Sequence, residues 1–123
     1  MRKTMMAAAA VATLCAGPAL AADDVMADSY GNTVVSTGGG LESRTHYRAD
    51  HTFDAVFTAA AGSMTSKGTW VVQGTQLCRT YDPLPPGLSN PVCIPVASHK
   101  IGDKWTVTVA GVAREATIVA GVQ

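Results

Sequence analysis

Short segments rich in Val, Thr, Ile and aromatic residues recur along the chain between glycine, asparagine, aspartate and proline residues. A spacing of roughly 8 to 12 residues between such segments is typical of β-sandwiches and β-barrels. The pattern predicts strands over about 33–37, 42–48, 52–58, 67–73, 76–81, 92–98, 104–109 and 114–120. The sequence therefore predicts an all-β antiparallel meander of about seven or eight strands, closed into a small barrel because closure removes exposed edges.

Alternation within these segments predicts which side chains face inward, because successive residues of a strand point to opposite faces. Leu41, Thr45 and Tyr47 fall on one face of their strand, whereas Glu42, Arg44, His46 and Arg48 fall on the other. Thr106 and Thr108 form the polar face of the strand near the C-terminus. The predicted inward set comprises Phe53, Phe57, Trp70, Val72, Leu77, Trp105 and Val107.

Glycine and proline mark the connections between these strands. Gly74 sits where a tight turn needs a positive φ. Residues 82–91 contain four prolines, which cannot donate to a ladder, so a stiff loop is expected there. Residues 23–32 are polar and acidic, and are expected to be frayed or to dock as an edge.

The first 21 residues have the order of a secretory signal peptide. Arg2 and Lys3 precede an apolar run, and Ala19-Leu20-Ala21 forms a small-x-small cleavage site. The apolar run is shorter than the roughly 20 residues that a membrane-spanning helix needs. We therefore expect a single mature domain, residues 22–123, in the periplasm or secreted. Lipid attachment at Cys15 is disfavoured because Leu14 and Ala12 do not fit the usual lipoprotein signal.

The net charge of the chain and the distribution of its basic residues limit the partners that it can bind. Cleavage of the signal would remove two of the nine basic residues and none of the nine acidic ones, which leaves a faintly acidic chain. A nucleic-acid-binding protein needs a clustered Lys/Arg footprint, and the chain has none. No second apolar segment is long enough to span a membrane. We expect a soluble monomer that binds no nucleic acid and does not span a membrane.

Two cysteines remain after the predicted cleavage, Cys78 and Cys93. An even pair in an exported chain is typical of a disulfide, which would pin both ends of the proline-rich loop. The competing interpretation, a metal-bound pair, lacks neighbouring Cys or His ligands. We expect the disulfide.

The densest polar group comprises His46, Asp50, His51 and Asp54. These residues could be interpreted as a metal or haem site, but strand alternation and the turn position of His51 favour a charged outer hairpin face with a polar tip. His99 has no Gly-x-Ser-x-Gly nucleophile to serve. We therefore expect no catalytic residue, no metal and no cofactor.

A set of short motifs extends over most of the predicted mature chain: Gly68-Thr69-Trp70, then Gly74, Leu77-Cys78, Cys93 and Gly102-Asp103-Lys104-Trp105, with Tyr30-Gly31-Asn32-Thr33 and the 47–52 turn before them. In these motifs the chain resembles a group of small uncharacterised secreted proteins of Gram-negative bacteria. The resemblance implies a lipocalin-like meander without an established activity. His51 departs from the pattern, in which glycine would follow Asp50.

Two hypotheses of function follow. The first is a non-enzymatic binding module for a small apolar ligand, with Phe53, Phe57, Trp70 and Trp105 as candidate lining residues, although we expect side chains to fill so narrow a barrel. The second is an interaction or hydrolase-inhibitor module of the cell envelope. In that module the tethered loop would present Leu84, Pro85, Pro86 and Leu88 to a partner protein.

Overall fold

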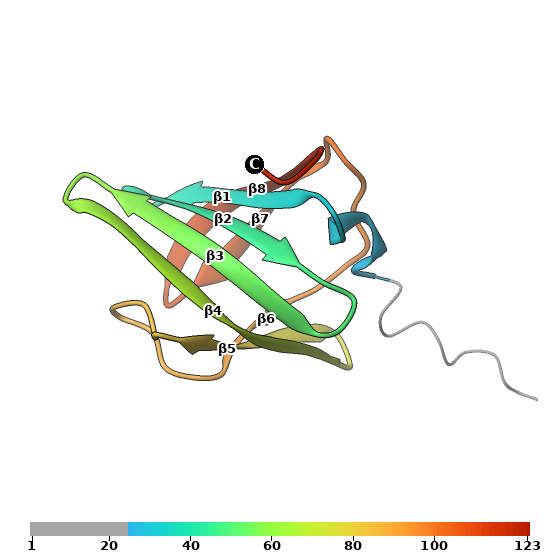
Figure 1. Cartoon of the computed structure of the whole chain (residues 1–123), viewed down its shortest axis with the longest axis horizontal. Helices are drawn as coiled ribbons and strands as arrows, with labels where there is room; N and C mark the ends of the chain where they lie inside the picture. The colour runs from blue at the N-terminus through green and yellow to red at the C-terminus, as the bar shows by residue number, and fades with distance from the viewer. Residues whose placement is uncertain (1–24) are drawn as a thin grey trace, which may run out of the picture.

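Eight antiparallel strands form one sheet that curls into a nearly closed barrel (Figure 1). The computed structural model describes residues 25–123, so the predicted signal peptide at 1–21 lies outside the described residues. The strands are β1 (Thr33–Gly38), β2 (Leu41–Tyr47), β3 (Thr52–Ala59), β4 (Gly62–Gln73), β5 (Gln76–Asp82), β6 (Val92–Pro95), β7 (Lys104–Val109) and β8 (Val112–Val119). The all-β meander predicted from the alternation is confirmed.

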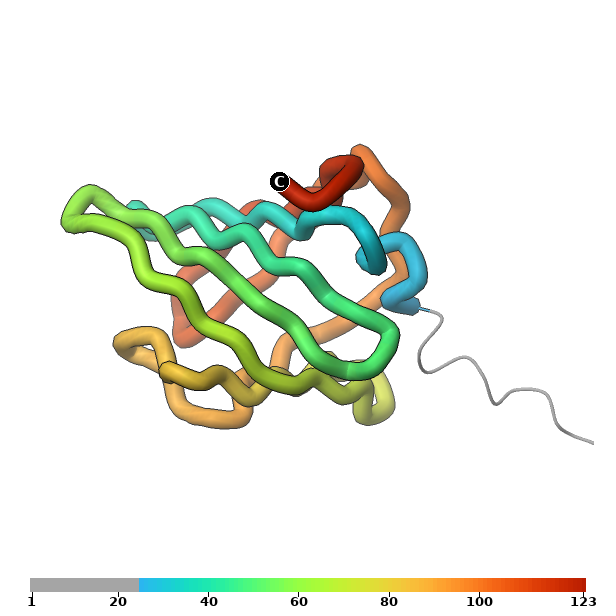
Figure 2. Tube along the Cα trace, viewed as in Figure 1, coloured from blue at the N-terminus to red at the C-terminus, as the bar shows by residue number. Residues whose placement is uncertain are grey.

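The strand order in the sheet is β6-β5-β4-β3-β2-β1-β8-β7, and every neighbouring pair is antiparallel. The chain trace shows the sheet turning back on itself so that β1 meets β8 (Figure 2). β6 and β7 end the order; they contact each other but form no ladder. Residues 96–103 connect these two strands. The barrel is therefore closed except for one seam between β6 and β7.

The inner face carries the residues that alternation predicted. Tyr47, Phe53 and Trp70 are almost fully buried, with 4%, 1% and 2% of their surface exposed. Leu77 and Val107 are also buried. On the outer face the same alternation places Glu42, Arg44 and His46. Register in the β2–β3 and β4–β5 hairpins is thus set by which face each strand must bury.

An aromatic core closes one end of the barrel. Trp70 contacts Tyr30 and Tyr47, and Phe53 contacts Tyr47 and Tyr81, with ring centroids 5.0 to 6.3 Å apart. The indole Nε1 of Trp70 donates a hydrogen bond to the carbonyl of Arg48 (3.0 Å), which satisfies its one polar group. This end therefore has the packing of an ordinary hydrophobic core.

The segment before β1 covers the same end. Ala27–Ser29 form a single 3₁₀ turn, labelled η2, and both Met26 and Ser29 are buried. Asn32 Nδ2 donates to the carbonyl of Asp28 (2.8 Å) and fixes the turn against the start of β1. The expectation that residues 23–32 are frayed or dock as an edge is wrong for the part the structure describes, because its apolar Met26 packs into the barrel end. No helix within residues 25–123 is long and apolar enough to cross a membrane.

The proline-rich loop is tied to the sheet at its base. Cys78 and Cys93 are directly paired in the β5–β6 ladder and form the predicted disulfide, with their Cα atoms 4.0 Å apart. Asn90 adds a second tie, because its side-chain amide exchanges two 2.9 Å hydrogen bonds with the backbone of Tyr81. Residues 83–91 therefore leave and rejoin the barrel at fixed points.

Candidate ligand-binding cavity

The barrel encloses a cavity of about 740 Å³. A filled interior was expected, and the difference arises from small residues at inward positions. Ser36 on β1, Ser43 and Thr45 on β2, and Ala116 on β8 all line the cavity, and none is large enough to reach the opposite wall. Tyr30, Phe53 and Trp70 pack at the η2 end instead, so the remaining volume stays open.

Loops rim the cavity where successive strands turn. Its lining includes Gly39 and Gly40 from the β1–β2 turn, Ala61 from the β3–β4 turn and Ala110 from the β7–β8 turn. Pro85, Pro86 and Leu88 of the proline-rich loop complete this rim. At the other end the lining includes Val25, Met26 and Ser29, which belong to or adjoin η2. The cavity thus runs from the closed end to the turns.

Apolar side chains make up most of the wall. They come from nearly every strand and include Val34, Leu41, Phe57, Met64, Leu77, Ile94, Val107, Val109 and Ile118. Such a wall favours a molecule with substantial apolar surface, because its burial removes that surface from water.

Arg79 places a charged side chain in this mostly apolar wall. It faces inward from β5 and is only 8% exposed. Its Nη1 donates to Tyr47 Oη at 3.4 Å, its guanidinium carbon lies 5.4 Å from the centre of the Tyr81 ring, and its buried Nε has no hydrogen-bond partner among the described residues. A guanidinium stays protonated at any physiological pH. The barrel therefore contains a buried positive charge.

Tyr81 lies beside this charge on the same strand. Burial raises the pKa of Tyr81 to about 12, and the nearby Arg79 only partly offsets that effect. Tyr81 therefore keeps its proton at neutral pH and does not neutralise Arg79. The pair is a cation against a neutral aromatic ring.

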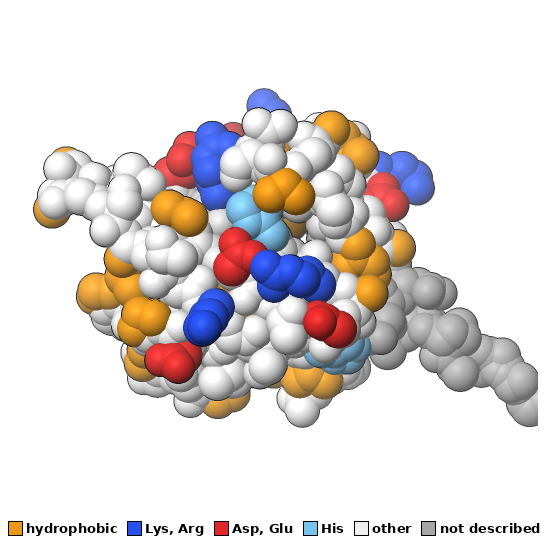
Figure 3. Space-filling view, in the orientation of Figure 1, with side chains coloured by type: hydrophobic (Ala, Val, Ile, Leu, Met, Phe, Trp, Pro, Cys, Tyr) orange, Lys and Arg blue, Asp and Glu red, His pale blue; other side chains and the backbone are white. Residues whose placement is uncertain are grey.

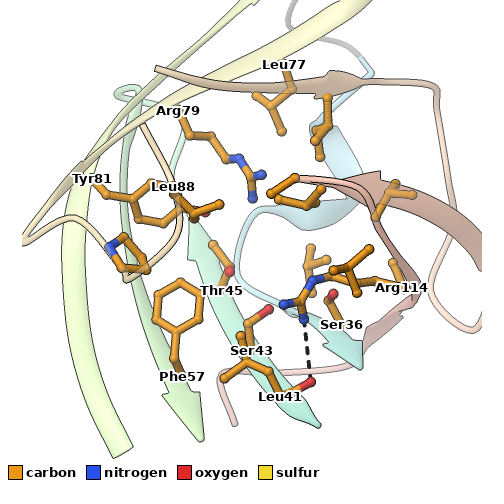
Figure 4. A pocket seen from close by; sticks show the side chains of 18 of the residues that line it. Ser36, Leu41, Ser43, Thr45, Phe57, Leu77, Arg79, Tyr81, Leu88 and Arg114 are labelled. Atoms are coloured by element: carbon orange, nitrogen blue, oxygen red, sulfur yellow. Dashed lines mark hydrogen bonds between the residues drawn. The ribbon is translucent and has the colours of Figure 1, made fainter. Parts of the chain in front are cut away.

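Arg114 on β8 brings a second guanidinium to the same cavity. It is half-buried, and its Nη1 donates to the carbonyl of Leu41 at 3.5 Å. Figure 4 shows Arg79 and Arg114 entering the interior from different sides, with the hydroxyl-bearing side chains of Ser36 and Ser43 near Arg114, and with Thr45, Phe57 and Leu88 also facing the interior. The cavity thus combines an apolar wall with a cluster of hydrogen-bond donors.

The four predicted lining residues divide into two pairs. Phe57 and Trp105 line the cavity. Phe53 and Trp70 belong to the aromatic core at the η2 end. Trp105 also stacks on His99, with ring centroids 3.6 Å apart, and His99 lines the cavity as well.

The predicted partner-binding loop lies against the barrel mouth. Pro85 is buried, Leu88 packs against the core cluster, and Pro86 is exposed at the rim. Leu84 is 39% exposed. The loop is therefore folded over the opening, and much of its apolar surface already has a partner within the chain.

The polar hairpin forms an ion-pair network on the outside of the barrel. Asp54 lies opposite His46 in the β2–β3 ladder, accepts a 2.8 Å hydrogen bond from its Nδ1 and also pairs with Arg48. Asp50 caps the turn by accepting from Thr52, and these hydrogen bonds lower the pKa of Asp50. Figure 3 shows acidic and basic side chains interspersed over β2, β3 and β4. No group of three or more His, Cys, Asp or Glu residues within 25–123 is arranged to hold a metal ion.

His51 occupies the tip of the β2–β3 turn in this hairpin. It adopts φ 70° there, a conformation that histidine tolerates better than most residues. Its ring stacks on Trp70 with centroids 4.1 Å apart. Stacking on the core indole therefore explains how histidine serves at a position where glycine would be expected.

The two cavity arginines were not singled out in the sequence, although a signal was present. Leu77 was predicted to face inward, and two further steps along the strand place Arg79 and Tyr81 on the same face. Likewise Val112, Arg114 and Ala116 share a face of β8. An arginine whose neighbours two positions before and two positions after it in a strand are both apolar is therefore the sequence pattern that indicates an inward-facing arginine.

Comparisons of the chain with protein-family models, with curated proteins and with solved structures found no match. What the cavity can bind is therefore inferred from its own residues.

Proposed function

We propose that this chain is an exported, non-enzymatic binding protein that holds a small, largely apolar molecule inside its barrel. The observation that supports this most is the cavity of about 740 Å³. Ligand sites usually have volumes of roughly 300 to 1,000 Å³ and are mostly apolar with a few placed polar groups. The wall described above has that composition.

The proposed location rests on different residues. Arg2, Lys3 and the Ala19-Leu20-Ala21 site form the export signal, and the Cys78–Cys93 disulfide suits an oxidising compartment. We therefore place the mature protein, residues 22–123, in the periplasm or outside the cell. The resemblance to small secreted proteins with a lipocalin-like meander is part of the same proposal.

A neutral fluorescent probe tests the binding function. N-phenylnaphthylamine should gain fluorescence on mixing with the purified mature protein, and native mass spectrometry should show one probe molecule per chain. Ser36→Phe fills the cavity from β1 and should weaken this binding at least about tenfold. Thr37→Phe is the matched control, because residue 37 is exposed on the outer face of the same strand. If the wild type takes up no probe, or if both variants bind equally well, the proposed function is wrong.

The alternative role, protein interaction through the loop at 83–91, rests on Leu84. This side chain is 39% exposed on a loop tied to the sheet at both ends. Affinity capture from envelope extract with wild type and Leu84→Asp would test it. Loss of a captured envelope protein in Leu84→Asp, at unchanged thermal stability, would support this role. Identical capture by both proteins would show that the loop does not bind a partner.

A further inference from the structure

We propose that the barrel cavity holds an anionic amphiphile whose carboxylate binds Arg79, with Arg114 as a second cation and the apolar chain along the apolar part of the wall that leads to the rim. This inference rests on the proposed binding function and adds the chemical class of the ligand. Its starting point is that Arg79 is a buried cation for which residues 25–123 supply no anion.

The charge on Arg79 is not balanced within the described chain. The ion pairs within residues 25–123 are Arg44–Glu42, His46–Asp54, Arg48–Asp54 and His99–Asp103, and none includes Arg79 or Arg114. Its contacts are with the neutral side chains of Tyr47 and Tyr81. Burial of an unpaired charge is costly, so buried arginines normally have an acidic partner. A bound anion would supply that missing partner.

The hydrogen-bonding capacity of Arg79 is also largely unused. A guanidinium has five N–H donors, whereas within residues 25–123 the guanidinium of Arg79 makes one hydrogen bond, the long one from Nη1 to Tyr47 Oη. Its Nε is buried and has no hydrogen-bond partner among these residues. A carboxylate accepts two parallel hydrogen bonds from the edge of a guanidinium, which makes it the best match for a planar donor fork.

The residues around Arg79 favour a ligand that has both an anionic head and an apolar chain. Arg114 and the hydroxyls of Ser43 and Thr45 line the same cavity and offer further donors to an anionic head (Figure 4). The remaining wall is apolar and leads to the rim formed by Pro85 and Leu88. A head group alone would leave that wall in contact with water, and a purely apolar molecule would leave Arg79 unpaired.

Two probes with the same chain and different heads test the inference. Dodecanoate and dodecanol should each displace N-phenylnaphthylamine from the mature protein, and dodecanoate should bind at least about tenfold more tightly, as expected for a charge-assisted bidentate pair. Arg79→Gln should remove this preference by weakening dodecanoate at least about tenfold while leaving dodecanol unchanged. Arg44→Gln is the matched control, because Arg44 lies on the outer face of β2 in an ion pair with Glu42.

The possible outcomes distinguish failure of the anion site from failure of the proposed binding function. Equal affinities of the wild type for dodecanoate and dodecanol would overturn the anion site while leaving the cavity as a binding site. Equal loss of both probes in Arg79→Gln would also overturn it. If Arg79→Gln does not fold, two measurements still test the anion site. One is the comparison of dodecanoate with dodecanol on the wild type. The other is Arg114→Gln, which should lower only dodecanoate binding and should fold, because Arg114 is half-buried. Failure of every probe to bind the wild type would refute the proposed function itself.

Discussion

Arg79 on β5 donates from Nη1 to Tyr47 Oη on β2, although β4 and β3 separate these two strands in the sheet. The contact crosses the interior of the barrel, and it exists only because the sheet curls. It holds the guanidinium of Arg79 at the inner surface, between the aromatic core and the cavity. Within residues 25–123 this geometry leaves the buried guanidinium of Arg79 without an acidic partner.

Arg79→Met should leave the ligand-free protein at least as stable as the wild type, with a gain of up to about 2 kcal/mol in the free energy of unfolding. Met is of similar length and needs no counter-charge, and apolar replacement of buried charges is often neutral or stabilising. Urea unfolding of delipidated protein measures the effect. A loss above about 2 kcal/mol would show that Arg79 is part of the stabilising core.

Trp70→Ala should destabilise the domain by about 3 to 5 kcal/mol, because it removes the centre of the aromatic cluster and leaves a void. Trp105→Ala is the comparison, since Trp105 is half-buried beside an existing cavity. Its cost should stay below about 2 kcal/mol. Equal costs measured by chemical denaturation would mean that the two ends of the barrel are packed alike.

Gly68→Ala should weaken pairing of β4 with β5. A Cβ at this inward position would overlap the carbonyl oxygen of Thr80 and lie 3.1 Å from Cζ of Phe53. Backbone cannot move aside as a side chain can, so we expect a loss of about 2 kcal/mol or more. Gly74→Ala, in an open turn with φ 62°, should cost only about 1 kcal/mol. A stable Gly68→Ala protein with unchanged thermal midpoint would contradict the close approach.

The Cys78–Cys93 disulfide should protect both thiols from alkylation in the native, unreduced protein. It closes a loop of sequence separation 15. In the chain-entropy model such a loop contributes about 3 kcal/mol, which for a domain of about 100 residues lowers the unfolding midpoint by roughly 10 °C or more on reduction. Cys78→Ser/Cys93→Ser should fold with a similarly lowered midpoint. Labelling of either cysteine without reductant would refute the bond.

Tyr81 should make the protein less stable in alkali. Its pKa is raised from 10.0 to about 12 in the folded state because burial disfavours the phenolate. Between pH 10 and 12 the unfolded chain releases this proton and the folded chain keeps it, so stability is full below pH 10 and falls by about 3 kcal/mol as pH approaches 12. Denaturant unfolding at pH 9 and 11.5 measures this loss, and Tyr81→Phe should lack it. An equal loss of stability in Tyr81→Phe would show that a group other than Tyr81 causes it.

Alternation in the sequence predicts all eight strands and most of their inward residues, although β4 begins five residues before and β6 ends three residues before the predicted bounds. Phe53, Trp70 and Trp105 sit in runs where every second residue is apolar, and a strand has only two faces, so burying one face fixes the other. The disulfide was predictable for a similar reason, because two cysteines flanking a proline-rich loop have few other partners. These features depend on local patterns and on elementary chemistry.

The cavity and its charge were decided only by the tertiary structure. Ser36, Ser43 and Thr45 look like ordinary polar strand residues, and only closure of β1 onto β8 shows that they face an interior too wide for them to fill. Arg79 and Arg114 are 35 positions apart in the sequence, and the curl of the sheet brings both into one cavity. Alternation along a strand tells which face a residue occupies, but not what lies across from that face. The distance across the barrel depends on how all eight strands close, and that relation is set by long-range pairing rather than by any local segment.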